Sequence, residues 1–297
     1  MGLDAFLKTA WQDHGEAPQD VAYRLVAACH QVETSEQVAP FVRLLVHVYG
    51  EHLGQWQLGV KLLAALRQQL AFAPDEAATA ALQKAAATLH YAGGDATALD
   101  TLAAPLRASA LASAASALAG RNDTARAITA FTEALRIAEL GLPAGSPTAR
   151  DLANAGNNLA TTLEQKTNRQ PMETTAMLLS AHAGLKYWKL AGTWLEEERA
   201  EYRLARSLLL AGQAGAAVEP AQRCVDVCVR NGAPAFELFF GYAVLGMAQR
   251  AAGQADAFVH SHAAALAQWL QVPEAERSWC QDDLNALGSA SPAPSQP

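Results

Sequence analysis

Apolar residues recur at spacings of three and four positions along nearly the whole chain, in which Ala, Leu, Glu, Gln and Arg dominate. This spacing places apolar side chains on one face of a helix, whereas the alternating pattern of a half-buried strand is nearly absent. The segments "TSEQ" (34–37) and "TWLE" (193–196) have the spacing of a capping box. Pro18, Pro40 and Pro171 fall near expected helix starts. The pattern therefore predicts an all-α protein of many helices joined by short turns.

The predicted turns recur at similar distances. They are expected at Gly54, Gly94, Gly120, Asn168, Gly212 and Gly253, which are 40, 26, 48, 44 and 41 residues apart. Four of these intervals suit a two-helix repeat, while the short one marks an irregular unit around Pro105. The helices that follow the turns carry a small residue early, and short side chains let two helices of a hairpin approach closely. We therefore expect stacked antiparallel hairpins that share one core.

Several residues at fixed places in these units carry a resemblance to a known family. They are Trp56 after Gly54, the triplet Tyr242, Leu245 and Gly246, and the series Ala127, Phe131 and Ala134. Through these residues the chain resembles the tetratricopeptide-repeat (TPR) family over about residues 36–270. The resemblance is weak over residues 75–119. "NNLA" (157–160) and "AVEP" (217–220) look like the longer repeats of the kinesin-light-chain type. The resemblance implies a right-handed superhelical solenoid of antiparallel helix hairpins.

One domain is expected over residues 1–287. It would comprise a leading helical pair (1–33), the repeats (36–270) and a capping helix (273–287). The small, polar and Pro-rich tail 288–297 is expected to be disordered.

The charge and the apolar runs exclude several classes of partner. The net charge is −7, from 22 basic and 29 acidic residues, which disfavours nucleic acid as a partner. No window of about 18 to 20 consecutive apolar residues is present, so no membrane span is expected. With no secretory signal pattern at the start and four scattered cysteines, a cytoplasmic location is the expectation.

The stretch "HLGQWQLGVKLLAAL" (52–66) is also similar to a phosphate-binding loop. Such a loop needs lysine directly after the second glycine, followed by Ser or Thr. Here Val60 follows Gly59, Lys61 comes one position late, and Trp56 stands where backbone N–H groups should converge. The stretch is better interpreted as an inter-helix turn followed by the second helix of a repeat.

No constellation typical of catalysis or metal binding is found in the sequence. Cys224 and Cys228 lie on one helix face. They could be two ligands of a metal site that would need two more ligands, or two cysteines packed in the core. His47, Glu51 and His52 have the wrong order and spacing for a zinc-binding helix. We therefore expect no enzyme, no catalytic residue, no metal site and no cofactor.

One group of residues is a candidate for partner binding. In the TPR family the first helix of each hairpin forms the concave wall, and the matching positions here are Asn154, Asn157, Asn158, Arg199, Tyr202, Arg203, Arg206, Met247 and Arg250. Asparagine amides can pair with a peptide backbone, and arginine can bind a carboxylate with two hydrogen bonds. The competing interpretation is a solvated face on which the arginines pair with Glu196 to Glu198, Glu201 and neighbouring carboxylates.

The function expected from this pattern is a non-enzymatic protein-interaction module or scaffold. It would bind an extended peptide or a partner helix in its concave groove. Two alternatives remain open. One is a structural solenoid that forms a homo-oligomer through its N-terminal pair or its C-terminal cap. The other is an enzyme or a small-molecule sensor with a pocket inside the superhelix.

Overall fold

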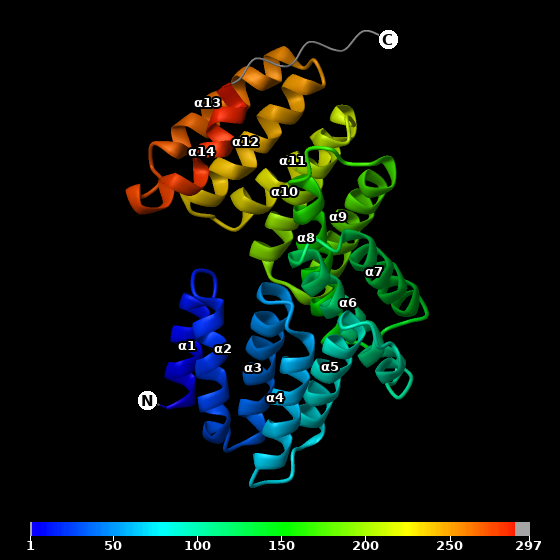
Figure 1. Ribbon diagram of the computed structural model, residues 1–297. Helices are drawn as coiled ribbons and strands as arrows, with labels where there is room; N and C mark the ends of the chain where they lie inside the picture. Colours follow the sequence, from blue (N-terminus) through cyan, green and yellow to red (C-terminus); the bar gives the residue numbers. More distant parts are fainter. Residues whose placement is uncertain (1, 289–297) are drawn as a thin grey trace. The chain divides into compact units, whose positions relative to one another are not determined.

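The computed structural model describes residues 2–288, and within this range the chain forms fourteen α-helices and no strand (Figure 1). The prediction of an all-α protein is confirmed. Three 3-10 turns, η1 (Cys29–Gln31), η3 (Thr97–Leu99) and η4 (Glu274–Glu276), and one π-helical turn, η2 (His47–His52), interrupt the α-helices. The α-helices are α1 (Leu3–Asp13), α2 (Pro18–Ala28), α3 (Ser35–Val46), α4 (Trp56–Gln69), α5 (Glu76–Ala92), α6 (Ala104–Gly120), α7 (Thr124–Glu139), α8 (Thr148–Glu164), α9 (Pro171–Ala191), α10 (Trp194–Leu210), α11 (Ala214–Arg230), α12 (Ala235–Ala251), α13 (Ala255–Trp269) and α14 (Arg277–Gly288).

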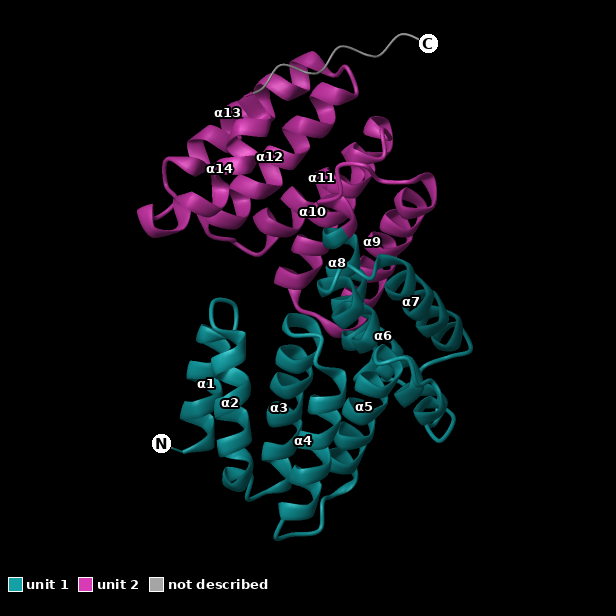
Figure 2. Cartoon of the chain, viewed as in Figure 1, with its two compact units in different colours: residues 1–162 teal, residues 163–297 magenta. Residues whose placement is uncertain are grey.

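The chain divides into two units, residues 1–162 and residues 163–297, with the boundary near the end of α8 (Figure 2). The single solenoid domain over 1–287 stays a prediction, as does its superhelical form. The predicted disordered tail lies outside the described residues, apart from Gly288, which ends α14.

Local sequence signals fix several helix ends. Thr34 and Gln37 form the predicted capping box of α3, and Thr193 and Glu196 form that of α10. The backbone N–H of Thr193 donates to Glu196 Oε2 over 2.8 Å. Pro40 differs from expectation, because it lies inside α3 and not at its start.

Unit 1 is built from helices that pack against their neighbours in the chain. α1 contacts α2 and α3, α5 contacts α3 and α4, and α6 contacts α5 and α7. Phe41, Leu45, Leu66 and Leu89 are fully buried in this core, where each such side chain stabilises the fold by about 1.5–3 kcal/mol. α6 is rich in alanine and is buried on most of its circumference, as expected for a helix that is apolar all round.

Gly59 marks a close contact between α4 and α5. A Cβ atom at this position would lie 2.8 Å from Leu89 Cδ1 and 3.1 Å from Tyr49 Cβ, too close for any side chain. The N–H of Gly59 donates to Gln55 O within the helical ladder, so it does not belong to a phosphate-binding nest. The stretch 52–66 thus runs into a helix, α4 (Trp56–Gln69), as expected, while the place of this helix in a repeat stays a prediction.

Unit 2 contains two helix hairpins, α10–α11 and α12–α13, with α9 packed on α10 and α14 on α12. Cys224 and Cys228 are fully buried in α11 as free thiols. Cys224 Sγ donates to Glu198 Oε1 over 3.2 Å. This placement fits the interpretation of the two cysteines as core residues.

Candidate functional site

A cavity of about 980 Å³ opens in unit 1. Its wall is formed by α3, η2, α5, α6, α8 and the loop before α8, together with Trp11 of α1. Much of the wall consists of alanine and serine side chains, among them Ala77, Ala81, Ser113 and Ser116. Short side chains leave room between the helices, and a cavity of about 300–1,000 Å³ is the usual size of a ligand pocket.

A fixed ion pair lies in the cavity wall and joins three helices. Lys84 Nζ of α5 donates to both carboxylate oxygens of Asp151 on α8, over 2.9 and 3.0 Å. The hydroxyl of Ser109 on α6 donates to the same carboxylate. Lys84 and Asp151 are both mostly shielded from solvent. Their charges cancel, so this part of the wall is polar without a net charge.

Two of the predicted partner-binding residues line this cavity. Asn154 and Asn158 follow Asp151 on one face of α8, at spacings of three and four residues, and both side chains are exposed. Asn157 is half-buried, and its backbone carbonyl accepts the hydroxyl of Thr161 over 2.8 Å. Asn154 and Asn158 are thus the members of the predicted asparagine row that line the cavity.

The predicted cationic row lies in unit 2, where each arginine of α10 binds a carboxylate. Arg199 Nη2 donates to Glu237 Oε1 of α12 over 2.6 Å. Arg203 forms an ion pair with Glu164, which also accepts the hydroxyl of Ser207 over 2.6 Å. The Glu164 and Glu237 side chains are only 5% and 8% exposed, so each depends on its partner for compensation of its buried charge.

The last arginine of this row is part of a three-membered network. Arg206 Nη1 and the hydroxyl of Tyr202 both donate to Asp283 Oδ1 of α14, over 2.9 and 2.7 Å. Burial, followed by the charge of Asp283, raises the pKa of Tyr202, so the phenol stays a donor. This network ties α10 to the C-terminal helix.

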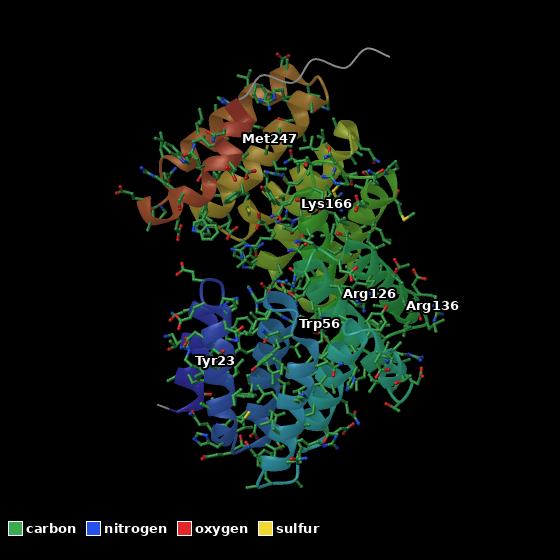
Figure 3. All side chains as sticks on the ribbon, viewed as in Figure 1. Tyr23, Trp56, Arg126, Arg136, Lys166 and Met247 are labelled. Carbon is green, nitrogen blue, oxygen red and sulfur yellow. The ribbon has the colours of Figure 1, made fainter. Side chains whose placement is uncertain are left out.

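The remaining predicted residues lie on α12. Met247 (labelled in Figure 3) is buried, and Arg250 donates to the backbone carbonyls of Leu287 and Ala286 over 2.7 and 2.8 Å. Arg250 therefore satisfies carbonyl groups in the last turn of α14.

The arginines pair with carboxylates, as the competing interpretation supposed, but the partners differ from those named. They come from helices other than α10, namely Glu164, Glu237 and Asp283. Glu201 is instead held by Lys189 and Arg223. A partner-binding role for the row stays a prediction, and any ligand carboxylate would have to compete with these buried ones.

Three histidines beside the cavity were missed from the sequence. His14 caps the end of α1, and His47 and His52 begin and end η2. Side chains five residues apart point to different sides of an α-helix, and His47, Glu51 and His52 do not have the order and spacing of a zinc-binding helix. In a π-helix each turn holds an extra residue, so His47 and His52 come to the same side, with their Nε2 atoms 3.1 Å apart. Hydrophobic periodicity gives no signal for a single π-turn or for the approach of His14.

Contacts from α6 hold this π-turn in place. Arg121 Nη1 donates to the backbone carbonyl of His52 over 2.7 Å. Gly120 lies against Glu51, where a Cβ atom would meet Glu51 Cγ at 2.5 Å. Burial, followed by the nearby His47 and His14, lowers the pKa of His52 and so favours the neutral form of this ring.

No helix among residues 2–288 is long and apolar enough to cross a membrane. No protein-family model and no curated protein matches the chain.

Proposed function

We propose that this chain is a protein-interaction module whose cavity in unit 1 holds an extended peptide segment, and that its hairpins stack as a superhelix of the TPR type. The main support for this proposal is the cavity of about 980 Å³, with its wall of short side chains and the exposed amides of Asn154 and Asn158. Hairpin pairs such as α10–α11 and α12–α13, and the small contact residue Gly59, support the repeat architecture.

The spacing of the two amides suits an extended backbone. Residues three or four apart on a helix have Cβ atoms about 5–6 Å apart. Alternate residues of an extended chain are about 6.5–7 Å apart. Asn154 and Asn158 can therefore pair with alternate peptide groups of one segment, since each amide offers a donor and an acceptor. Both side chains stand on a helix whose geometry is fixed before binding, which lowers the entropy cost of association.

The charges in the cavity favour a peptide without a high net charge. Lys84 is neutralised by Asp151, and Arg43, Glu51 and Glu76 add charges of both signs elsewhere in the wall. The alanine-rich parts of the wall offer apolar contact to small and medium side chains. Selection of peptides from a random library on the purified chain, followed by titration against variants of Asn154 and Asn158, tests this proposal.

A second candidate function is self-association, for which an exposed apolar patch gives support. Tyr23 and Val26 on α2 are 68% and 55% exposed, and Leu58 on α4 is 50% exposed. These three side chains line one shallow pocket in unit 1 (Tyr23 is labelled in Figure 3). Light scattering over a range of concentrations tests this candidate. A Tyr23→Ser/Leu58→Ser variant should lose any dimer that the wild-type chain forms.

A further inference from the structure

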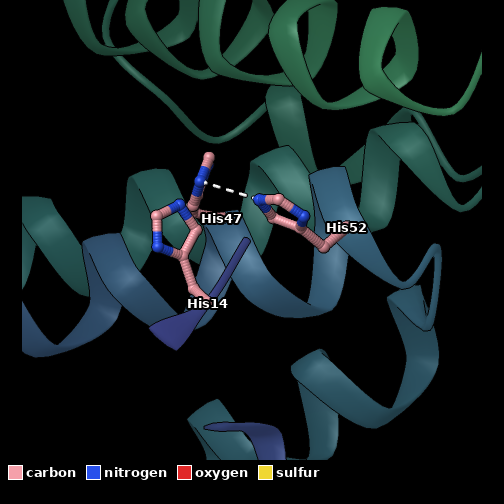
Figure 4. A group of neighbouring side chains, drawn as sticks. All are labelled: His14, His47 and His52. Atoms are coloured by element: carbon pink, nitrogen blue, oxygen red, sulfur yellow. Dashed lines mark hydrogen bonds between the residues drawn. The ribbon is translucent and has the colours of Figure 1, made fainter. Parts of the chain in front are cut away.

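The imidazole rings of His14, His47 and His52 face one another beside the cavity of unit 1 (Figure 4). Their ring centroids are 4.7–5.0 Å apart. One nitrogen from each ring lies within 4.8 Å of the others. Three imidazoles that converge in this way from two separate segments form a potential ligand set.

The hydrogen bonds on the outer side of two rings fix where their protons lie. His14 Nδ1 is 2.7 Å from the backbone carbonyl of Trp11, and His47 Nδ1 is 2.9 Å from Glu51 Oε2. A carbonyl and a carboxylate accept hydrogen bonds and do not donate them, so each ring carries its proton on Nδ1. The Nε2 atoms of His14 and His47 are left with lone pairs. Metal-binding histidines are typically oriented by this arrangement, with a carbonyl or carboxylate behind the ring.

We propose that His14, His47 and His52 bind one divalent transition-metal ion, with zinc as the best fit. Three neutral imidazoles match the nitrogen donors that zinc prefers, and the Glu51 carboxylate behind His47 offsets part of the charge of the ion. Zinc–nitrogen bonds of about 2.0–2.1 Å in a tetrahedron place ligand nitrogens about 3.4 Å apart. The Nε2 atoms of His47 and His52 are already 3.1 Å apart, and the full set has to contract from at most 4.8 Å.

Binding of the ion requires a change of tautomer at His52. Without metal, His52 donates its Nε2–H to the lone pair of His47 Nε2. With metal, both Nε2 lone pairs bind the ion, and the neutral His52 ring carries its proton on Nδ1 instead. The tautomer changes while the charge of the ring does not.

The π-turn that creates this arrangement is held by the surrounding structure. Isolated π-turns inside helices are rare and often mark functional sites. Here Gly120 of α6 and Arg121, which directly follows α6, pack against η2, and the Trp11 ring lies 5.1 Å from both the His14 and the His47 rings. The three ligands are therefore held near one another before an ion binds.

Three protein ligands leave one position of a tetrahedral ion for another donor. His47 and Glu51 both line the cavity. The fourth ligand is accordingly water or a donor atom of a molecule in the cavity.

The test is a calorimetric titration of the full, tag-free and chelator-treated chain with zinc chloride alone. The expected result is one ion bound per chain. The His47→Ala/His52→Ala variant should weaken binding by at least about 100-fold, since loss of an outer-shell partner alone typically costs 10- to 100-fold. The control variant His182→Ala/His260→Ala removes two exposed histidines outside the cluster and should bind as the wild type does.

Two additions keep this test decisive. Circular dichroism checks that each variant is folded, and if the double variant unfolds, His14→Ala replaces it, because this half-buried residue lies outside η2. Cobalt bound in place of zinc should give the strong visible absorption of tetrahedral Co²⁺, and this band should disappear in the variants. The proposal is overturned if the wild type binds no zinc, or if zinc binding survives unchanged in the folded histidine variants.

Discussion

Arg206 Nη1 lies 2.9 Å from Asp283 Oδ1, and this pair joins α10 to the C-terminal helix α14 across 77 residues of sequence. The Asp283 side chain is only 7% exposed and also accepts the hydroxyl of Tyr202. A residue selected from the sequence as a partner contact is thus bound to a buried carboxylate of the same unit.

This relationship predicts that Arg206 contributes to stability. Arg206→Ala should lower the free energy of unfolding by about 1–3 kcal/mol, because it removes a charged donor from the buried Asp283 carboxylate. Urea denaturation followed by circular dichroism measures the change, with the exposed Arg230→Ala as control. The cost of Asp283→Ala should be smaller in the Arg206→Ala background than in the wild type. Equal costs in both backgrounds would show that the pair is not coupled.

The pKa of Glu198 predicts a pH dependence of stability in unit 2. Burial, opposed by the hydrogen bond from Cys224 and reinforced by Glu237, raises this pKa from 4.5 to about 8. Between these values the folded state keeps a proton that the unfolded state has lost. The free energy of unfolding should therefore fall as pH rises through this interval, by at most about 1.4 kcal/mol per pH unit.

The variant Glu198→Gln isolates this contribution, because it cannot ionise. Its stability relative to the wild type should increase steadily from pH 5 to pH 8 in denaturant titrations. The exposed Glu274→Gln serves as a control and should follow the wild type at each pH. Parallel pH profiles for Glu198→Gln and the wild type would mean that Glu198 ionises normally in the folded chain.

The close contact at Gly59 predicts a steric cost. Gly59→Ala would place its Cβ atom 2.8 Å from Leu89 Cδ1, so we expect a loss of about 1–3 kcal/mol from forced repacking. Gly215→Ala in α11 is the matched control, since its Cβ atom would meet nothing within 4 Å. That control should be neutral or stabilising by about 0.5–1 kcal/mol, because alanine favours helix over glycine. Similar thermal shifts for both variants would contradict close packing of α4 on α5.

The sequence predicted the features that depend on local patterns. The helical class follows from apolar spacing, the starts of α3 and α10 follow from capping boxes, and the tight contact at Gly59 follows from a small residue early in the helix after a turn. These signals lie within a few residues of the feature that they predict, so they can be recognised in a single sequence without knowledge of distant contacts.

Features that depend on distant residues were not predictable in this way. Glu164 and Asp283 are 39 and 77 residues from their arginine partners, and no periodicity connects them. The π-turn of η2 shifts the register of one helical turn without changing the apolar pattern, so nothing in that pattern indicates that His52 lies beside His47. Asn154 and Asn158, which the sequence indicated as partner contacts, line the cavity, but the ion pair of Lys84 with Asp151 beside them was not expected.

Peptide binding in the cavity of unit 1 is the central claim, and fluorescence anisotropy with a library-selected, labelled peptide tests it most directly. Asn154→Ala/Asn158→Ala should weaken binding by roughly 10- to 100-fold, because each amide contributes about 0.5–1.5 kcal/mol through its hydrogen bonds. The matched control Asn168→Ala/Asn285→Ala changes two exposed asparagines in unit 2 and should leave affinity unchanged. A selected peptide that binds the folded Asn154→Ala/Asn158→Ala variant as tightly as the wild type would contradict the account.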